Sequence, residues 1–352
     1  MDIGSIGDLL TPEGGMLLLS LGAAFAFSLG ITVITIPGLI RRMRDGGMVG
    51  RDVNKRGNVE VPELGGIAAL FAFSISLSLI VGIKKLTGDI AETPYLAVIA
   101  VFFIAAMVGL IDDISNIAQR MKAVAVAFAA LPLMLVHIGD RVALPFGYSI
   151  PVLPDTTFYL VFWVLLVPLG VTGVANAMNM SAGYNGLESG QITVVSAAML
   201  GVLIFQGGQP DYSTYITAAL VGGALGLYAF NRYPAKVFVG DIGTLGMGAA
   251  LAGGIILGHI EVYGLIAILP AFFEAFATFY YSVVRKVPDR RHACHHPVIL
   301  EDGRLQPPPG AERYTLAYWI LSKKPMTEKQ LVRVILALYA ASGVAAIVLS
   351  VL

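Results

Sequence analysis

Residues 176–190 read NAMNMSAGYNGLESG, and this stretch lies between apolar runs at 157–175 and 190–205. Each run has about the 20 residues that a membrane-spanning helix needs. The stretch itself holds three asparagines, one glutamate and three glycines in fifteen positions. Polar groups at the edge of hydrocarbon are costly unless something binds them. We therefore predict a connection between two membrane helices that carries a binding site.

Apolar runs of similar length recur along the whole chain. They predict an all-α integral membrane protein with about ten transmembrane helices. We find no internal repeat, so we expect residues 1–352 to form a single polytopic domain with a long loop at about 285–330. The runs lie near residues 16–36, 64–83, 95–111, 122–138, 157–175, 190–205, 213–230, 243–260, 262–284 and 331–352.

The composition agrees with this class. Hydrophobic residues make up 57% of the chain and charged residues 13%, far from the balance of a soluble domain. The 23 basic and 23 acidic residues cancel, so the bulk charge indicates no nucleic-acid partner. Cys294 is the only cysteine, which excludes an internal disulfide. No basic residue precedes the first apolar run, so we expect that run to stay as an anchor rather than be cleaved as a signal peptide.

The basic residues divide the connections between the runs into two groups. Twenty of the 23 Lys and Arg residues lie on odd-numbered connections, and Lys84, Lys85 and Arg141 are the exceptions. By the positive-inside rule, the odd-numbered connections face the cytoplasm and both termini lie outside. The polar clusters lie on the same connections. We therefore expect a site that faces the cytoplasm, in the cell membrane or, for a eukaryotic chain, in the membrane of the endoplasmic reticulum.

The third connection begins with two adjacent carboxylates. Asp112 and Asp113 follow directly on an apolar run, and Asn116 and Lys122 come next. Neighbouring carboxylates repel at low dielectric, so a divalent cation or a cationic side chain would relieve them. The alternatives are acids that sit in water at a helix end and a lysine that only anchors the helix.

The fifth and seventh connections supply amides and another carboxylate. Asn176 and Asn179 are three residues apart and share a helix face if the helix continues, and Asn185 follows in a GYNG turn. Amide oxygens can bind a hard cation, and a whole amide can recognise a base edge. Asp241 begins an apolar, Gly-rich run, where it is either a metal ligand or a helix N-cap.

The ninth connection is basic and rich in histidine. Arginines next to histidines favour a polyanion such as a diphosphate over a soft metal. The five residues are Arg290, Arg291, His292, His295 and His296. Glu274 stands apart in the middle of an apolar run, where a carboxylate is functional by default, but the sequence shows no partner for it.

Taken together, these clusters resemble the polyprenyl-phosphate N-acetylhexosamine-1-phosphate transferase family. The segments are DVNK (52–55) with VPELGG (61–66), IDDISNIAQRMK (111–122), NAMNMSAGYNGLESGQ (176–191), NRYPAKVFVGD (231–241) and PDRRHACHH (288–296). They occur in the family's order and on one predicted side. The first, third and fourth segments look like the eukaryotic dolichyl-phosphate GlcNAc-1-phosphotransferase. The last looks like the histidine motif of the bacterial members with one extra residue, and this mixture suggests an archaeal member.

The resemblance implies a reaction and a role for each position. GlcNAc-1-phosphate would move from UDP-GlcNAc to a polyprenyl phosphate of the dolichyl type, which gives GlcNAc-diphospho-polyprenol and UMP and starts a lipid-linked glycan such as that of N-glycosylation. Mg²⁺, with Mn²⁺ as an alternative, would bind Asn179 and Asp241. Asn185 would contact uridine, and Lys122 would hold the diphosphate.

The remaining positions follow in the same way from the resemblance. Asp112, Asp113 and Asn116 would form the pocket where the lipid phosphate and the metal meet, and Glu63 would lie near the acetamido group of the sugar. The residues of the ninth connection would clamp diphosphate and sugar. We predict Asp112, Asp113, Lys122 and Asp241 as catalytic, and the substrate-binding set as Glu63, Asn116, Asn176, Asn185, Arg290, Arg291, His292, His295 and His296.

Three alternatives remain open from the sequence. The same reaction could use another UDP-HexNAc or a MurNAc derivative. A transporter or flippase would also suit an intramembrane glutamate and broken helices, although the chain has no repeats and its polar clusters lie on one side. The oligomeric state is open, with a homodimer as one alternative.

Overall fold

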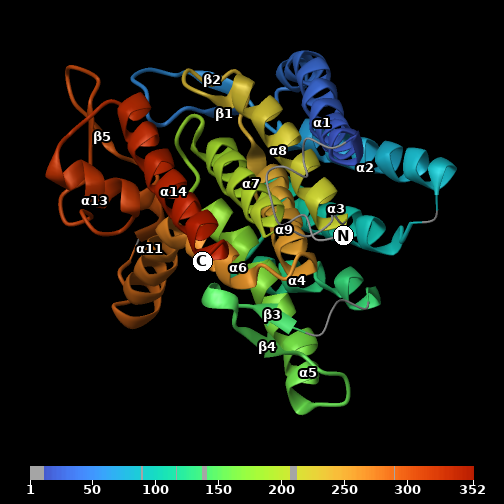
Figure 1. The fold of residues 1–352 in the computed structure, drawn as a ribbon. Coiled ribbons are helices and arrows are strands. Elements are labelled where there is room, and N and C mark those ends of the chain that lie inside the picture. Colours follow the sequence, from blue (N-terminus) through green and yellow to red (C-terminus); the bar gives the residue numbers. More distant parts are fainter. Residues whose placement is uncertain (1–11, 89, 116, 137–140, 207–211, 289) are drawn as a thin grey trace.

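The computed structural model describes residues 12–88, 90–115, 117–136, 141–206, 212–288 and 290–352. Within these ranges the chain is almost entirely helical, which confirms the all-α prediction (Figure 1). The helices of seven or more residues are α1 (Pro12–Asp45), α2 (Gly66–Thr87), α3 (Thr93–Ser115), α4 (Gln119–Phe128), α6 (Val167–Met180), α7 (Leu187–Phe205), α8 (Tyr212–Asn231), α9 (Gly240–Leu257), α10 (Glu261–Ala267), α11 (Leu269–Thr278), α13 (Leu316–Lys323) and α14 (Glu328–Ser350). The short ones are η2 (Leu131–Leu135), η3 (Pro145–Gly147), α5 (Thr157–Val161), η4 (Phe162–Leu166), η5 (Phe279–Val284) and α12 (Arg290–Cys294).

Three short antiparallel hairpins, which the sequence patterns did not predict, join some of these helices. Each strand has only two or three residues, too few for an alternating pattern to be recognised. The pairs are β1 (Val49–Arg51) with β2 (Glu60–Pro62), β3 (Arg141–Ala143) with β4 (Ser149–Pro151), and β5 (Val298–Ile299) with β6 (Leu305–Gln306).

The apolar runs form helices, but two of the ten differ from simple spans. Among the described residues, eight helices are long and apolar enough to cross a membrane. The run at 262–284 forms α10 followed by α11 and η5, bent by 74°. Pro270 follows the break, and proline cannot continue a helix from the preceding turn. The run at 122–138 forms the shorter helix Met121–Leu135, in which α4 ends at Phe128 and Pro132 is the second residue of η2.

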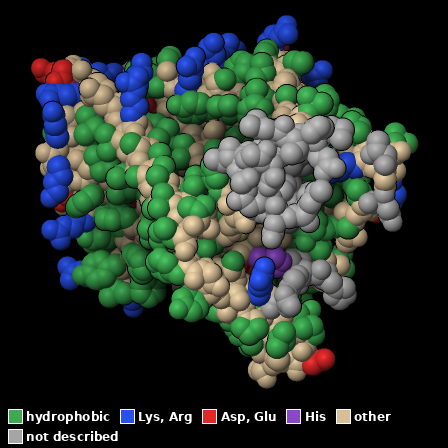
Figure 2. Space-filling view, viewed as in Figure 1, with side chains coloured by type: hydrophobic (Ala, Val, Ile, Leu, Met, Phe, Trp, Pro, Cys, Tyr) green, Lys and Arg blue, Asp and Glu red, His purple; other side chains and the backbone are tan. Residues whose placement is uncertain are grey.

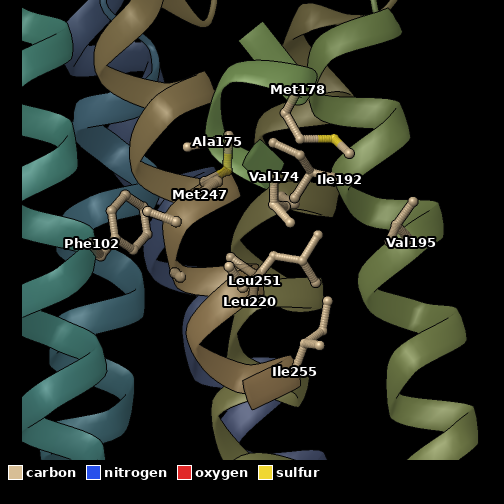
Figure 3. Close-up of a cluster of buried hydrophobic side chains, with 14 of the residues drawn as sticks. Phe102, Val174, Ala175, Met178, Ile192, Val195, Leu220, Met247, Leu251 and Ile255 are labelled. Atoms are coloured by element: carbon tan, nitrogen blue, oxygen red, sulfur yellow. The ribbon is translucent and has the colours of Figure 1, made fainter. Parts of the chain in front are cut away.

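Helix α9 is the centre of the bundle. Neighbouring helices surround it, and apolar side chains from α3, α6, α7 and α8 pack against it (Figure 3). Small residues allow this close packing, as is usual between membrane helices. A Cβ on Gly66 of α2 would lie 2.2 Å from Cα of Gly243, and a Cβ on Gly109 of α3 would lie 2.3 Å from the backbone oxygen of Asp241. Backbones therefore meet directly where α9 begins.

The surface agrees with a membrane protein that has distinct ends. In Figure 1, hairpin β1–β2 lies at the top and hairpin β3–β4 with α5 lies at the bottom. The face in Figure 2 is largely hydrophobic, whereas Lys and Arg side chains gather along its upper and left edges.

Candidate active site

The polar clusters of the first, third, fifth and seventh connections meet at one end of the bundle. They line a cavity of about 230 Å³. Its described lining carries five carboxylates and one guanidinium, so it is strongly acidic. The lining includes Arg51, Asp52, Asn54, Glu63, Asp113, Gly183, Asn185, Glu188, Gly240, Asp241 and Thr244.

Beside this cavity, the ammonium group of Lys122 is surrounded by oxygen atoms. The Lys122 side chain is buried, and its Nζ donates to Asp112 Oδ2 at 2.8 Å and to Asn179 Oδ1 at 3.2 Å. It also donates to Asp241 Oδ2. Residues from α3, α4, α6 and α9 thus meet at one cation. The structure brings together four side chains that the sequence predicted for catalysis or metal binding.

Asn179 is held in one orientation by its other contacts. Its Nδ2 donates to Asp241 Oδ1 at 2.7 Å and to Thr244 Oγ1 at 2.8 Å. The amide oxygen is therefore the atom that faces Lys122. Thr244 is a contact that the sequence prediction missed, although its position three residues after Asp241 places it on the same helix face.

The two adjacent aspartates face different partners. Asp112 accepts from Lys122 and, through Oδ1, from the backbone N–H of Ile117 at 2.7 Å. Asp113 accepts instead from the backbone N–H groups of Asp241 at 2.9 Å and Ile242 at 3.0 Å. Both oxygens of Asp113 therefore cap the N-terminus of α9. The N-cap function weighed for Asp241 belongs in the structure to Asp113.

A glycine before Asp241 makes this arrangement possible. Gly240 has a φ of +73°, a conformation that residues with a side chain rarely adopt. A Cβ at Gly240 would also lie 3.0 Å from Asp113 Oδ2. The chain can thus turn into α9 close to the capping carboxylate.

Asn185, another lining residue, belongs to a second buried network. Its Nδ2 donates to Asp52 Oδ2 at 2.8 Å and to Glu328 Oε2 at 3.1 Å, and its backbone N–H donates to Glu328 Oε1 at 2.7 Å. Asn54 and Lys55 contact the same carboxylates. Asn185 Oδ1 has no partner within the described part of the chain. The Asn185 amide is therefore held through its nitrogen, and its oxygen is left as an acceptor for a ligand.

Glu63 and Glu188 complete the acidic lining. Burial of the Glu63 side chain, and then the nearby Asp241 charge, raise the pKa of Glu63 above its usual range. Its carboxylate packs on Gly50 of β1, because a Cβ there would lie 2.1 Å from Glu63 Oε1. Glu188 Oε1 accepts from the backbone N–H of Gly183 at 3.1 Å. Glu188 was missed as a site residue, although it lies within the stretch 176–190.

The structure does not place Asn176 or Asn116 at the cavity. The Asn176 side chain donates to Thr172 O at 2.8 Å within its own helix, and Asn176 is not among the described lining residues. Asn116 lies outside the described residues. Their substrate-binding roles stay predictions.

His295 of the ninth connection lies near the wall of the cavity. His295 Nδ1 would lie 3.8 Å from a Cβ at Gly183, which lines the cavity. His292 and His296 stack on each other, with ring centroids 4.0 Å apart. Arg290 Nη2 donates to Tyr314 O at 2.7 Å and to Thr278 Oγ1 at 3.1 Å. It therefore links the segment before α13 to the end of α11. The side chain of Arg291 lies outside the described atoms.

Comparison with known proteins identifies the family. A model of the family described as "Glycosyl transferase family 4" matches residues 95–259, which contain Asp112, Lys122, Asn179 and Asp241. A relative from Sulfolobus acidocaldarius is 31% identical over 262 residues, which are 74% of this chain and 78% of the relative. The chain belongs to glycosyl transferase family 4.

Three relatives of this family 4 chain come from archaea and bacteria. The Sulfolobus protein is provisionally named a UDP-N-acetylglucosamine–dolichyl-phosphate N-acetylglucosaminephosphotransferase. A Methanocaldococcus jannaschii protein, provisionally named a glycosyltransferase, is 30% identical over 305 residues, covering 86% of this chain and 87% of the relative. A phospho-N-acetylmuramoyl-pentapeptide-transferase of Solidesulfovibrio magneticus is 28% identical over 260 residues, covering 65% of this chain and 69% of the relative. The family expected from the polar clusters is confirmed.

Proposed function

We propose that this chain transfers GlcNAc-1-phosphate from UDP-GlcNAc to a polyprenyl phosphate of the dolichyl type, and so starts a lipid-linked glycan. The products are GlcNAc-diphospho-polyprenol and UMP. The observation that carries the proposal is the convergence of Asp112, Asn179 and Asp241 on Lys122 beside the acidic cavity. The name of the Sulfolobus relative supports this choice of substrates.

The same oxygen atoms suit a divalent metal. Oxygens of Asp112, Asn179 and Asp241 already surround one cationic atom, the Lys122 ammonium, and carboxylate and amide oxygens are the ligands that Mg²⁺ prefers. Asn179 and Asp241 would hold Mg²⁺, or Mn²⁺ in its place, with Asp112 next to them. When bound, the metal supplies positive charge to the diphosphate.

The protein's own residues then position and neutralise the reactants. A phosphate oxygen of the lipid attacks the β-phosphorus of UDP-GlcNAc, and the bond from that phosphorus to UMP breaks. This reaction needs alignment and charge compensation more than covalent help. Lys122 would provide a positive charge for the diphosphate, and Asp113 fixes the start of α9 and hence Asp241. A lipid phosphate is largely ionised at pH 7, because its second pKa is about 6, so a strong base is not required.

The other substrate contacts follow from the cavity lining. Asn185 would recognise uridine and Glu63 would approach the acetamido group. His295, whose Nδ1 lies near Gly183 of the lining, would contact the sugar diphosphate. The excess of basic residues on the odd-numbered connections supports a cavity that opens to the cytoplasm, with both termini outside.

A second candidate is the same reaction with a MurNAc derivative or another UDP-HexNAc. The Solidesulfovibrio relative, by its name, acts on a phospho-N-acetylmuramoyl-pentapeptide. A panel of UDP-sugars assayed with dolichyl phosphate distinguishes these donors. UMP release with UDP-GlcNAc well above that with the MurNAc donor supports the first proposal, and the reverse order supports the second.

The deciding experiment measures UMP release by the purified protein in detergent, where no sealed compartment exists. An enzyme releases UMP that depends on Mg²⁺ and on the lipid acceptor, whereas a transporter or flippase only binds its substrates. Asp241→Asn should lower the rate by at least about a hundredfold, as removal of one charge-stabilising group commonly does. Asp302→Asn is the matched control, because Asp302 is exposed and pairs with Arg304. Full Mg²⁺-dependent turnover by Asp241→Asn would overturn the assignment.

A further inference from the structure

Glu274 is a buried carboxylate that the proposed reaction does not use. It lies in α11, is 6% exposed, and its Oε1 accepts from the backbone N–H of Leu316 at 2.8 Å. Leu316 is the first residue of α13. Within the described part of the chain, no ion pair to Glu274 is found. Glu274 therefore accepts from one of the backbone N–H groups that have no partner within their own helix, because they lie at its start.

Arg290 makes a second contact that holds the start of α13 in place. Arg290, at the start of α12, donates to the carbonyl oxygen of Tyr314 at 2.7 Å and to Thr278 Oγ1 at the end of α11 at 3.1 Å. The segment before α13 is therefore held against both α11 and α12. Glu274 and Arg290 act on neighbouring backbone groups of the same turn.

α13 in turn contacts residues 292–296, the histidine segment. Tyr318 is fully buried, and its hydroxyl donates to the carbonyl oxygen of Ala293 at 2.7 Å. Ala293 lies in α12 between His292 and His295. His295 Nδ1 is next to Gly183, at the wall of the cavity. A continuous set of contacts thus leads from Glu274 through α13 and α12 to the cavity wall.

We propose that Glu274 is a positioning residue: its buried oxygen caps α13 and thereby holds the histidine segment of residues 292–296 against the cavity wall at Gly183. This role rests on the proposed function for its kinetic consequence. The contact requires an acceptor oxygen and not a negative charge, because a glutamine or a protonated carboxyl group offers the same oxygen to the Leu316 N–H. A proton relay or a transport site would instead require the ionisable carboxyl group.

The experiment compares Glu274→Gln with Glu274→Ala. Glu274→Gln should keep the KM for UDP-GlcNAc within about twofold, because the acceptor remains. Glu274→Ala should raise this KM about tenfold or more, with a smaller change in kcat, because a buried N–H loses its acceptor and the histidine segment loosens. Glu301→Ala is the control, since Glu301 is an exposed carboxylate in the ninth connection, which also contains the histidine segment.

A double-mutant cycle tests whether the effect passes through the histidine segment. In a His295→Ala background, Glu274→Ala should raise the KM little further, because residues that act together are not additive. Tyr318→Phe breaks the next contact in the set without altering a buried carboxyl group, so it tests the proposal even if Glu274→Ala does not fold. It should raise the KM in the same direction.

Hydrogen exchange separates this proposal from the proposed function. The Leu316 amide should exchange faster in Glu274→Ala and normally in Glu274→Gln, whether or not the protein releases UMP. Faster exchange of the Leu316 amide in Glu274→Ala, with no UMP release by the wild type, would support the capping contact and overturn the proposed function. Loss of activity in Glu274→Gln equal to that in Glu274→Ala, or an unchanged KM in both Glu274→Ala and Tyr318→Phe, would overturn the positioning role.

Discussion

Replacing Lys122 by methionine removes the ammonium group on which the oxygens of Asp112, Asn179 and Asp241 converge. Methionine keeps the length of the apolar stem, so the substitution chiefly tests the charge. Removal of one partner of a buried ion pair costs about 3–5 kcal/mol, because the other charge stays buried without compensation. The Asp241 side chain is 27% exposed, which favours the lower end, about 3 kcal/mol. For a chain of 352 residues this corresponds to a fall in Tm of about 4 °C.

Mg²⁺ should reverse this loss if it binds the same oxygens. At a hundred times its Kd, a ligand of the folded state stabilises it by about 2.7 kcal/mol, which is close to the loss. In the wild type such a metal would have to displace the Lys122 ammonium from shared oxygens, so its stabilising effect should be smaller. Thermal unfolding in detergent, with chelator and then with increasing Mg²⁺, measures both effects.

The comparison has a matched control and a clear negative outcome. Lys324→Met removes an exposed lysine of the ninth connection and should leave both unfolding curves unchanged. If Lys122→Met is as stable as the wild type in chelator, the buried charges do not depend on Lys122. An equal Mg²⁺ shift in both proteins would place the metal elsewhere.

Three further predictions test the surroundings of this site. Asp113→Ala should lower the free energy of unfolding by about 1–2 kcal/mol and reduce UMP release, because the start of α9 loses its cap; Asp113→Asn keeps one acceptor and should lose less in the same unfolding assay. Gly109→Ala should cost about 1–3 kcal/mol and activity, since its Cβ would lie 2.3 Å from the Asp241 backbone oxygen, whereas Gly82→Ala, with nothing within 4 Å, should be nearly neutral. The raised pKa of Glu63 means that the charged form is disfavoured in the folded state, so the wild type should lose stability as pH rises from the usual glutamate pKa through the raised one. The gain in Tm from Glu63→Gln should therefore be larger at pH 8 than at pH 4, and an equal gain at both would contradict this explanation.

Part of the site could be predicted because its residues lie at helix ends on one predicted side. The run before Asp112, the stretch around Asn179 and the run after Asp241 each mark such an end. The different partners of Asp112 and Asp113 could not be predicted. Adjacent residues on a helix point about 100° apart, and which one meets α9 depends on the close contact at Gly109.

Long-range buried contacts could not be predicted from the sequence either. Glu328 is an acid in the first turn of an apolar helix, a common place for a solvated residue. In the structure it is buried and contacts Asn185, 143 residues away. Similarly, Glu274 had no visible partner because Leu316 offers a backbone N–H group, which no residue type reveals.

The central position of α9 also bears on how the protein is inserted during synthesis. Among the eight described spans, α8 and α9 have the lowest mean hydropathy and are the most buried. Such segments partition weakly into lipid by themselves. Their main partners are α1, α2 and α7 for α8, and α3, α6 and α2 for α9, and all of these leave the ribosome earlier. Helix α9, which begins with Gly240 and Asp241, would therefore enter the membrane only when the helices that surround it are already there.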